Sequence, residues 1–245
     1  MEKQMRKLLL LALLLVPYAG LFAQGPKIDS VAVLLIDRMG MIIGDLNSCS
    51  FTLNTSLDIN DPDLGLVKHF NQHSVCLSGP DKMLIQTNGY KGHRGFWYDG
   101  KSLHFYSYGE NNYAVIPAPD NTIATIDSVN KTYDIEFPAA DFFYPTFTDD
   151  LLAASDVLSY AGKSQVGGIN CFQIVAKGKD KGVQIWLSDD EWFLPVKYVI
   201  CYYNTTPTVQ YEATFSDWKI NQQMPDAMFE FSPPPGARRI EILAK

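Results

Sequence analysis

The sequence is poor in positive charge, in cysteine and in histidine, and each shortage excludes a class of function. Its 20 lysine and arginine residues are outnumbered by 27 aspartates and glutamates, which gives a formal net charge of -7. No basic surface is therefore available for tracking nucleic-acid phosphates, and we expect no nucleic-acid partner. The four cysteines form no Cys-x-x-Cys pair, which excludes zinc-ribbon and thioredoxin-like sites.

Signatures of catalysis are also lacking. No Gly-x-Ser-x-Gly motif is present, and Gly162-Lys163-Ser164 is not a phosphate-binding loop because Val157 stands where that motif needs glycine. His69 and His73 lie in a predicted strand, where they are about 13 Å apart, so we expect solvent-facing histidines. We expect no catalytic residue, no metal and no cofactor. A histidine placed beside a carboxylate on the inner face of the sheet would favour a hydrolase instead.

The one long apolar run lies at the N-terminus. Basic residues precede Leu8–Val16, and the small residue Ala23 follows a few positions later. This order is typical of a secretory signal peptide. The alternative is a retained anchor, but the run is interrupted by Pro17 and is shorter than the roughly 20 residues of a membrane span. We expect residues 1–23 to be cleaved and residues 24–245 to form a single periplasmic domain without a transmembrane segment.

Export to an oxidising compartment permits the cysteines to form disulfides. Asn60–Gly65 is a predicted turn, and folding its flanking strands about the centre places Cys49 opposite Cys76. A disulfide between these two residues is one interpretation, and four buried free cysteines is the other. Cys171 and Cys201 are expected two strand spacings apart, roughly 9 to 10 Å, which is too far for a bridge.

One helix precedes many strands. Asp29 is a typical helix N-cap, and the helix that follows is predicted to end near Gly44. Its expected inner face consists of Val31, Leu34, Leu35, Met39, Ile42 and Ile43. Beyond it, apolar residues alternate and turn residues recur at short intervals, which predicts an antiparallel meander of about 10–11 strands. Between Pro117 and Leu152 the alternation stops, and we expect one or two helices, near residues 120–133 and 138–144, packed over the open side of the sheet.

Apolar residues of equal parity in the late strands predict one apolar concave face and one solvated face, as in a curved sheet or half-barrel. An apolar lining can shelter acyl chains, because each buried methylene contributes about 0.8 kcal/mol. Its tyrosines favour an amphipathic ligand, since they pair an apolar ring with a polar hydroxyl. Each position is a candidate for plain core as well as for ligand contact. The candidates are Phe51, Leu53, Phe96, Tyr98, Leu103, Phe105, Phe172, Ile174, Ile185, Tyr198, Ile200, Tyr211 and Phe215.

Two segments resemble a known family. Trp97–Tyr106 and Asp226–Ala237 resemble a strand pair and the closing segment of the LolA family, the periplasmic carriers of outer-membrane lipoproteins. Residues 29–243 are similar to an uncharacterised family of predicted periplasmic proteins in the same superfamily. The landmarks of that similarity are Phe96–Gly100, Asp134–Pro138, Leu194–Lys197 and Phe215–Trp218. The resemblance implies a mainly β, half-closed antiparallel barrel, with an N-terminal helix and a helical plug over an apolar cavity.

The resemblance also implies a function, with one departure. It implies a non-catalytic carrier or chaperone whose cargo is an acyl lipid or a lipoprotein and whose partners include envelope membrane proteins. In the lipoprotein carriers an arginine before the proline of one turn latches the lid helix, whereas Gly79 stands there in this chain. Arg94 and Arg238 are candidates to replace it. The same fold also serves as an envelope sensor that binds a partner protein, which is the alternative; a hydrolase is the third hypothesis.

Overall fold

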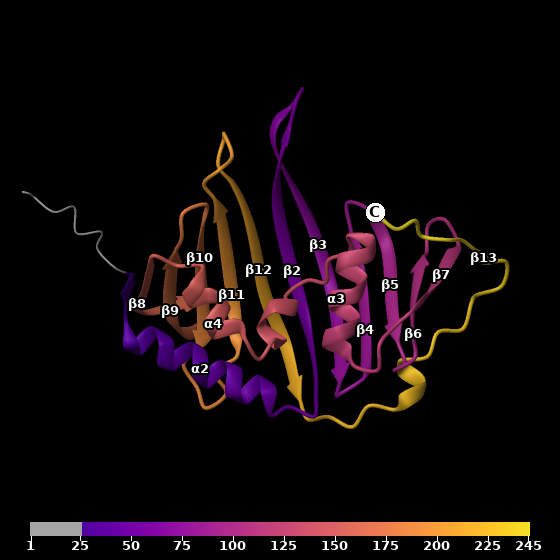
Figure 1. The fold of residues 1–245 in the computed structure, drawn as a ribbon, viewed down its shortest axis with the longest axis horizontal. Coiled ribbons are helices and arrows are strands. Elements are labelled where there is room, and N and C mark those ends of the chain that lie inside the picture. Colours follow the sequence, from indigo (N-terminus) through magenta and orange to yellow (C-terminus); the bar gives the residue numbers. More distant parts are fainter. Residues whose placement is uncertain (1–25) are drawn as a thin grey trace, which may run out of the picture.

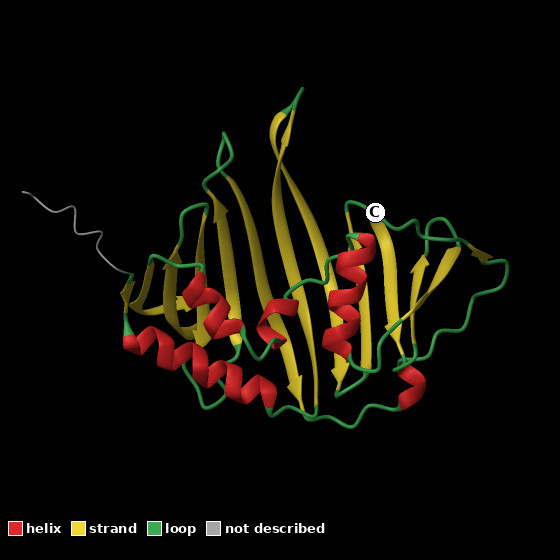
Figure 2. Cartoon of the chain, viewed as in Figure 1, coloured by secondary structure: helices red, strands yellow, loops and turns green. Residues whose placement is uncertain are grey.

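One curved sheet dominates the protein (Figures 1 and 2). The computed structural model describes residues 26–245, so the predicted signal peptide, residues 1–23, lies outside the described residues. The sheet has 13 strands in the order β1-β8-β9-β10-β11-β12-β2-β3-β4-β5-β6-β7-β13, and it does not close. The strands are β1 Lys27–Ile28, β2 Ser48–Asp61, β3 Gly65–Ser78, β4 Lys82–Gly89, β5 Gly92–Tyr98, β6 Ser102–Ser107, β7 Asn112–Pro117, β8 Val157–Val166, β9 Ile169–Lys177, β10 Lys181–Ser188, β11 Pro195–Tyr202, β12 Val209–Ile220 and β13 Arg238–Arg239.

The antiparallel meander is formed by β2 to β12, and the predicted half-closed, mainly β architecture is confirmed. The two-residue strands β1 and β13 add parallel edges, β1 on β8 and β13 on β7. The two halves of the meander join where β12 pairs with β2. Ile185, Tyr198 and Ala213 lie directly opposite one another on β10, β11 and β12, so these apolar residues share one face, as their parity predicts.

Helix α2, Ser30–Gly44, begins at the predicted cap. Asp29 accepts a hydrogen bond from the Val31 amide at 2.9 Å and another from the Tyr160 amide on β8 at 3.1 Å, which ties the helix start to the sheet. The expected inner face is partly wrong, because Val31 and Leu34 are 45% and 68% exposed. The small side chain of Ala32 allows close packing, and the buried stripe is Ala32, Leu35, Ile36, Met39 and Ile43.

The segment between β7 and β8 covers part of the concave face, as predicted (Figure 2). It contains α3, Thr122–Tyr133, the 3-10 helix η1, Ala140–Phe143, and α4, Phe147–Ala153. Asn121 caps α3 by accepting a hydrogen bond from the Ala124 amide at 2.8 Å. The third element, α4, was not expected from the sequence, since its seven residues are too few for a clear helical period.

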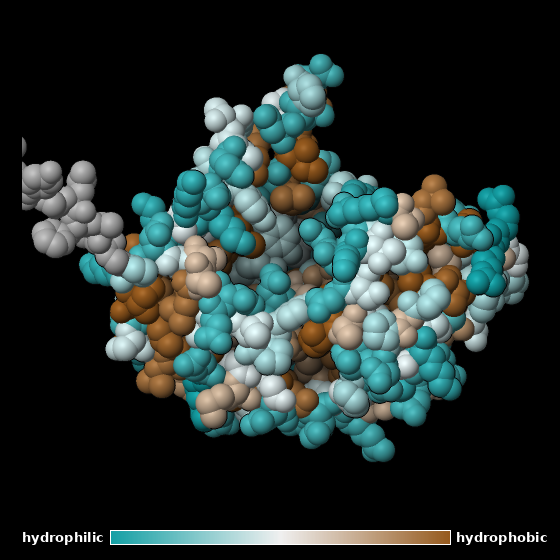
Figure 3. All heavy atoms as spheres, viewed as in Figure 1, coloured by the Kyte–Doolittle hydropathy of each residue, from teal (hydrophilic) through white to brown (hydrophobic). Residues whose placement is uncertain are grey.

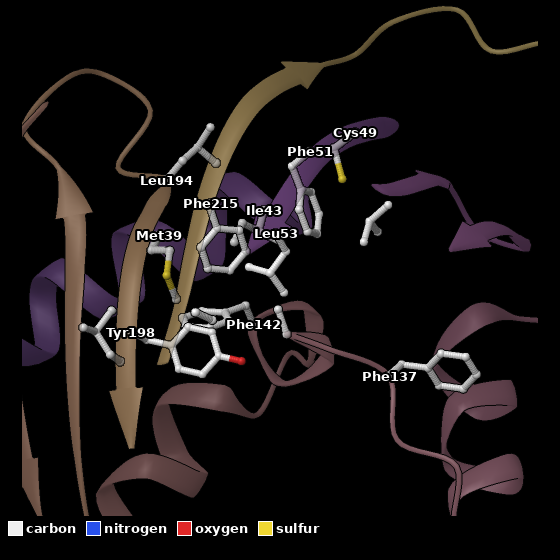
Figure 4. Close-up of a cluster of buried hydrophobic side chains, with 14 of the residues drawn as sticks. Met39, Ile43, Cys49, Phe51, Leu53, Phe137, Phe142, Leu194, Tyr198 and Phe215 are labelled. Carbon is white, nitrogen blue, oxygen red and sulfur yellow. The ribbon is translucent and has the colours of Figure 1, made fainter. Parts of the chain in front are cut away.

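The main hydrophobic core lies between η1, α2 and the middle of the sheet (Figure 4). Phe142 of η1 packs edge-on against Phe215 of β12 and Tyr198 of β11, with ring centroids 5.7 and 5.1 Å apart. Phe51 of β2 packs against Trp218 with centroids 4.4 Å apart. The contacts of Phe142 fix η1 against the sheet, and η1 forms part of one wall of the space described below.

Of the two interpretations of the cysteines, the structure contradicts the Cys49–Cys76 disulfide. All four cysteines are free. Cys49 pairs with Leu77 and Cys76 pairs with Ser50, so the two thiols are offset by one residue and point to opposite faces of the sheet. The cause is the turn: Asp61 pairs with Gly65, which leaves a three-residue loop whose centre lies half a residue beyond the expected one. Burial and the nearby Cys76 raise the pKa of the Cys49 thiol to about 12.

The C-terminal segment covers the outer face of β5 to β7. After the 3-10 helix η2, Asp226–Met228, Phe229 is fully buried. Phe231 packs against an aromatic cluster with centroid distances between 5.0 and 5.7 Å, formed by Trp97, His104, Tyr106 and Tyr113. The outer face of β5 to β7 is therefore covered by the chain itself.

Candidate ligand-binding cavity

A cavity of about 990 Å³ lies on the concave face (Figure 3). One wall is formed by β2 to β6 together with β11 and β12, and the other by α3 and residues 134–141. In the space-filling view it is the hollow near the centre of the face, below the projecting β2–β3 hairpin. The cavity is the space that remains between the sheet and this covering segment.

The sheet wall carries an apolar row. Ile85, Phe96 and Phe105 lie directly opposite one another on β4, β5 and β6 and all line the cavity. Phe96 contacts Phe105 with centroids 5.3 Å apart and meets Phe137 edge-on at 5.2 Å. Phe137 comes from the covering segment, so the apolar row continues from the sheet onto the opposite wall.

Tyrosines line the cavity at its β11–β12 side. The Tyr198 hydroxyl donates to the Tyr211 hydroxyl at 3.3 Å, and Ile200 and Tyr202 lie on the same wall. Burial, first of all, raises the pKa of Tyr198 well above its ordinary value and also raises those of Tyr202 and Tyr211. The phenols therefore stay neutral at physiological pH and offer hydrogen bonds beside apolar rings.

His73 lines the cavity, and the expectation that it faces solvent is wrong. Its side chain is 7% exposed, because His73 and Val75 lie two residues apart on β3 and both face the concave side of the sheet. Its Nε2 is 3.2 Å from the Thr55 hydroxyl and its Nδ1 is 2.8 Å from the Thr87 hydroxyl. Burial and the Arg94 charge lower its pKa to about 4, so the ring is neutral at pH 7.

The covering wall is acidic. Asp127, Asp134, Glu136 and Asp141 line the cavity from α3 and the following segment. The Tyr144 hydroxyl donates to Asp127 at 2.6 Å, and Asp134 forms a salt bridge with Lys245. Burial and the Asp127 carboxylate raise the pKa of Tyr144. Apolar residues line this wall as well, among them Ile126, Ile135 and Phe137, so both walls combine apolar and polar groups.

The candidate residues divide between cavity and core. Phe96, Phe105, Tyr198, Ile200 and Tyr211 line the cavity. Phe172 packs against Phe193, with parallel rings 5.7 Å apart. The remaining candidates are buried in the core, namely Phe51, Leu53, Tyr98, Leu103, Ile174, Ile185 and Phe215.

The segment between β7 and β8, which covers the concave face, is held to the sheet by hydrogen bonds. The arginine that latches the lid helix in the lipoprotein carriers is absent, since Gly79 stands at its position. The Thr122 amide at the start of α3 donates to the Pro80 carbonyl at 3.0 Å, beside Gly79. The Tyr98 hydroxyl donates to the Pro119 carbonyl at 2.6 Å. Within residues 26–245 neither Arg94 nor Arg238 forms a salt bridge, so these hydrogen bonds, and not an arginine ion pair, tie the segment to the sheet.

The contacts of the histidines bear on the hydrolase hypothesis. The ring nitrogens of His73 contact threonine hydroxyls and no carboxylate. His104 lies on the outer face, with its Nε2 2.9 Å from the Ser102 hydroxyl. Across the described part of the chain, no group of three or more histidine, cysteine or acidic residues is arranged to hold a metal ion.

Residues 32–243 match the family described as "Predicted periplasmic protein (DUF2092)". The chain belongs to this family. The resemblance to a family of periplasmic proteins is thereby confirmed, and the family description agrees with the predicted periplasmic location. No helix among residues 26–245 has the length and apolar character that a membrane crossing requires. No curated protein matches the sequence.

Solved structures share the fold of this DUF2092 protein. An uncharacterised conserved protein from Thermus thermophilus is 10% identical with a TM-score of 0.50, and the match covers 86% of this chain and 98% of that one. The MucA/MucB complex of Pseudomonas aeruginosa is 11% identical with a TM-score of 0.44, covering 82% and 61%. The LolA superfamily protein NE2245 from Nitrosomonas europaea is 11% identical with a TM-score of 0.33, covering 82% and 97%. At these identities the similarity concerns the fold alone.

Proposed function

We propose that the protein is a non-catalytic periplasmic carrier that binds an amphipathic acyl ligand, a lipid or a lipidated protein, in the cavity. The observation that supports this proposal is the cavity of about 990 Å³ with an apolar row on its sheet wall and hydrogen-bonding tyrosines beside it. Binding sites for small ligands are typically concave and of roughly 300–1,000 Å³, with polar groups that fix orientation. This cavity has that size, and its lining combines the apolar row with charged and polar residues.

The energetics favour a ligand with a long apolar chain. Burying about ten methylenes contributes on the order of 8 kcal/mol. The cost of association is of a similar order, about 4–15 kcal/mol, so a short chain is not retained. Phe96, Phe105 and Ile200 supply the apolar contact, and the neutral phenols of Tyr198 and Tyr211 accept or donate hydrogen bonds.

Native mass spectrometry and analysis of organic extracts test this proposal on protein purified from the periplasm with its own signal sequence. We expect a stoichiometric acyl lipid or lipidated peptide. Ile200→Trp places a bulky ring in the cavity and should reduce the bound amount several-fold. Leu66→Trp, at a position 47% exposed and outside the cavity lining, is the matched control and should leave it unchanged. A reproducibly empty wild-type protein would contradict the carrier function.

The second candidate function is that of an envelope sensor that binds a partner protein. The β2–β3 hairpin projects beyond the rest of the sheet and exposes Leu64, Leu66 and Phe70, of which Leu64 is 77% and Phe70 65% exposed (Figure 1). Apolar side chains on such a projection suit a protein contact. A photo-crosslinker at position 70, used in intact cells, tests it: a single envelope protein crosslinked to an otherwise empty chain would favour this function over the carrier.

A further inference from the structure

A row of polar side chains crosses the concave face at the cavity. His73, Thr87, Arg94 and Ser107 lie directly opposite one another on β3, β4, β5 and β6, and directly opposed residues share a face. The first three line the cavity. The next row, two residues along each strand, consists of Val75, Ile85, Phe96 and Phe105. The wall therefore changes from polar to apolar within about 6–7 Å.

Arg94 is the cation of the polar row, and its charge is not compensated. Within residues 26–245 its guanidinium makes no salt bridge, and its Nε is buried without a hydrogen-bond partner. Its direct cross-strand neighbours, Thr87 and Ser107, are uncharged, and His73 is neutral at pH 7 because its pKa is lowered to about 4. A half-buried, unpaired guanidinium is a strong receptor for a carboxylate or a phosphate, which it can bind through two parallel hydrogen bonds.

An apolar void continues the apolar row away from Arg94. It has a volume of about 30 Å³ and shares Ile85, Ile126, Phe137, Pro138 and Ala140 with the wall of the main cavity. The other residues around it are Phe51, Val75, Leu77, Met83, Thr122, Ile123 and Phe143. Apolar surface therefore extends from the neighbourhood of a single positive charge, over aromatic rings, to an almost wholly apolar end.

The other charged groups on the cavity lining are exposed. Asp127, Glu136 and Asp141 line it from the covering segment, and Lys91 and Lys181 also line it. Water screens exposed charges of both signs. Arg94 is half-buried, so its charge is screened less and dominates the binding of an anionic head group.

We propose that Arg94 recognises the head group of an acyl ligand that carries one negative charge, a carboxylate or a phosphodiester, while the acyl chain lies along Phe96 and Phe105 toward Phe137. This inference rests on the proposed carrier function and names its ligand class. Thr87 and Ser107 flank Arg94 on the neighbouring strands, and the neutral ring of His73 contributes no charge to the site.

Displacement of a neutral fluorescent probe, N-phenyl-1-naphthylamine, from the mature protein tests the proposal. The competitors are palmitate, lysophosphatidylglycerol and, as the uncharged control, monopalmitin. We expect at least one anionic competitor to bind roughly ten- to a hundred-fold more tightly than monopalmitin, as a charge-assisted hydrogen bond implies. Preference for palmitate indicates a carboxylate ligand, and preference for lysophosphatidylglycerol indicates a phosphodiester.

Variants of Arg94 separate charge recognition from structural damage. Arg94→Gln should abolish the preference for the anion and leave monopalmitin binding unchanged, and Arg94→Lys should restore part of the preference. Arg239→Gln, at an exposed edge position outside the cavity lining, is the control and should behave as wild type. An unchanged preference in Arg94→Gln, or an equal loss for charged and uncharged competitors, overturns the role of Arg94 while the carrier function stands. Failure of the wild-type protein to bind the probe or any acyl competitor refutes the carrier function itself.

Discussion

The wall formed by η1 offers the most direct test of the cavity. Phe142 is 4% exposed and contacts Phe147, Tyr198 and Phe215, with ring centroids 5.0, 5.1 and 5.7 Å away. Replacing a buried phenylalanine by alanine typically costs about 3–5 kcal/mol, because transfer free energy is lost and a cavity is left. Three aromatic contacts are lost together, so we expect Phe142→Ala to lower the free energy of unfolding toward the upper end of that range.

Urea unfolding followed by tryptophan fluorescence measures this change. With a denaturant dependence of about 2 kcal/mol per molar, a loss of about 4 kcal/mol moves the midpoint by about 2 M. Phe70→Ala removes the same side chain from a position that is 65% exposed and should change stability by less than about 0.5 kcal/mol. A midpoint shift below about 0.5 M for Phe142→Ala would refute the reasoning, because η1 would then not be packed on the sheet in solution.

Three further predictions concern pH, the lid and the thiols. The pKa of His73 is lowered from 6.5 to about 4 on folding, so the unfolded chain takes up the proton first as the pH falls. Urea unfolding measures the free energy of unfolding of the wild type and of His73→Gln at each pH. The difference between the two should be constant above pH 6.5 and should change by roughly 3 kcal/mol, to the disadvantage of the wild type, between pH 6.5 and 4. A pH-independent difference would contradict this. Tyr98→Phe removes the hydrogen bond to the Pro119 carbonyl and should lower the free energy of unfolding by about 1–3 kcal/mol. Hydrogen exchange of the α3 amides should become faster. Unaltered exchange would show that this bond does not hold the segment between β7 and β8 on the sheet. Cys49 should resist iodoacetamide at pH 8 in the native state, since its pKa is about 12, whereas all four cysteines should be alkylated in urea without reductant; fewer than four would reveal a disulfide.

The elements that depend on short-range signals were predictable from the sequence. Asp29 caps α2 because its carboxylate reaches an amide two residues away, and such a contact depends only on neighbouring residues. The shared face of Ile185, Tyr198 and Ala213 follows from a period of two in strands joined by short turns. Both signals involve neighbours along the chain, so no knowledge of distant contacts was needed.

Register was harder to predict, because it depends on the conformation of a single turn. Asp61 accepts hydrogen bonds from the amides of Asp63 and Leu64 at 2.9 Å, which stabilises a three-residue loop. One residue of slip moves Cys76 to the face opposite Cys49 and removes the predicted disulfide. The burial of His73 was within reach of the sequence, because it shares parity with Val75, but its polar side chain favoured a solvent-facing assignment.

The sheet pattern alone could not separate core from cavity, because a filled barrel and a ligand site require the same apolar inner positions. Leu53 and Phe105 both face inward from their strands, yet Leu53 is fully buried in the core and Phe105 lines the cavity. The difference lies in the segment that covers them. Where that segment places Phe142 against Tyr198 and Phe215, the sheet is sealed. Over Phe96 and Phe105 the same segment supplies Phe137 together with the exposed carboxylates of Glu136 and Asp141, and a cavity remains. The apolar parity of the strands is the same in both places, so it is the covering segment that separates core from cavity.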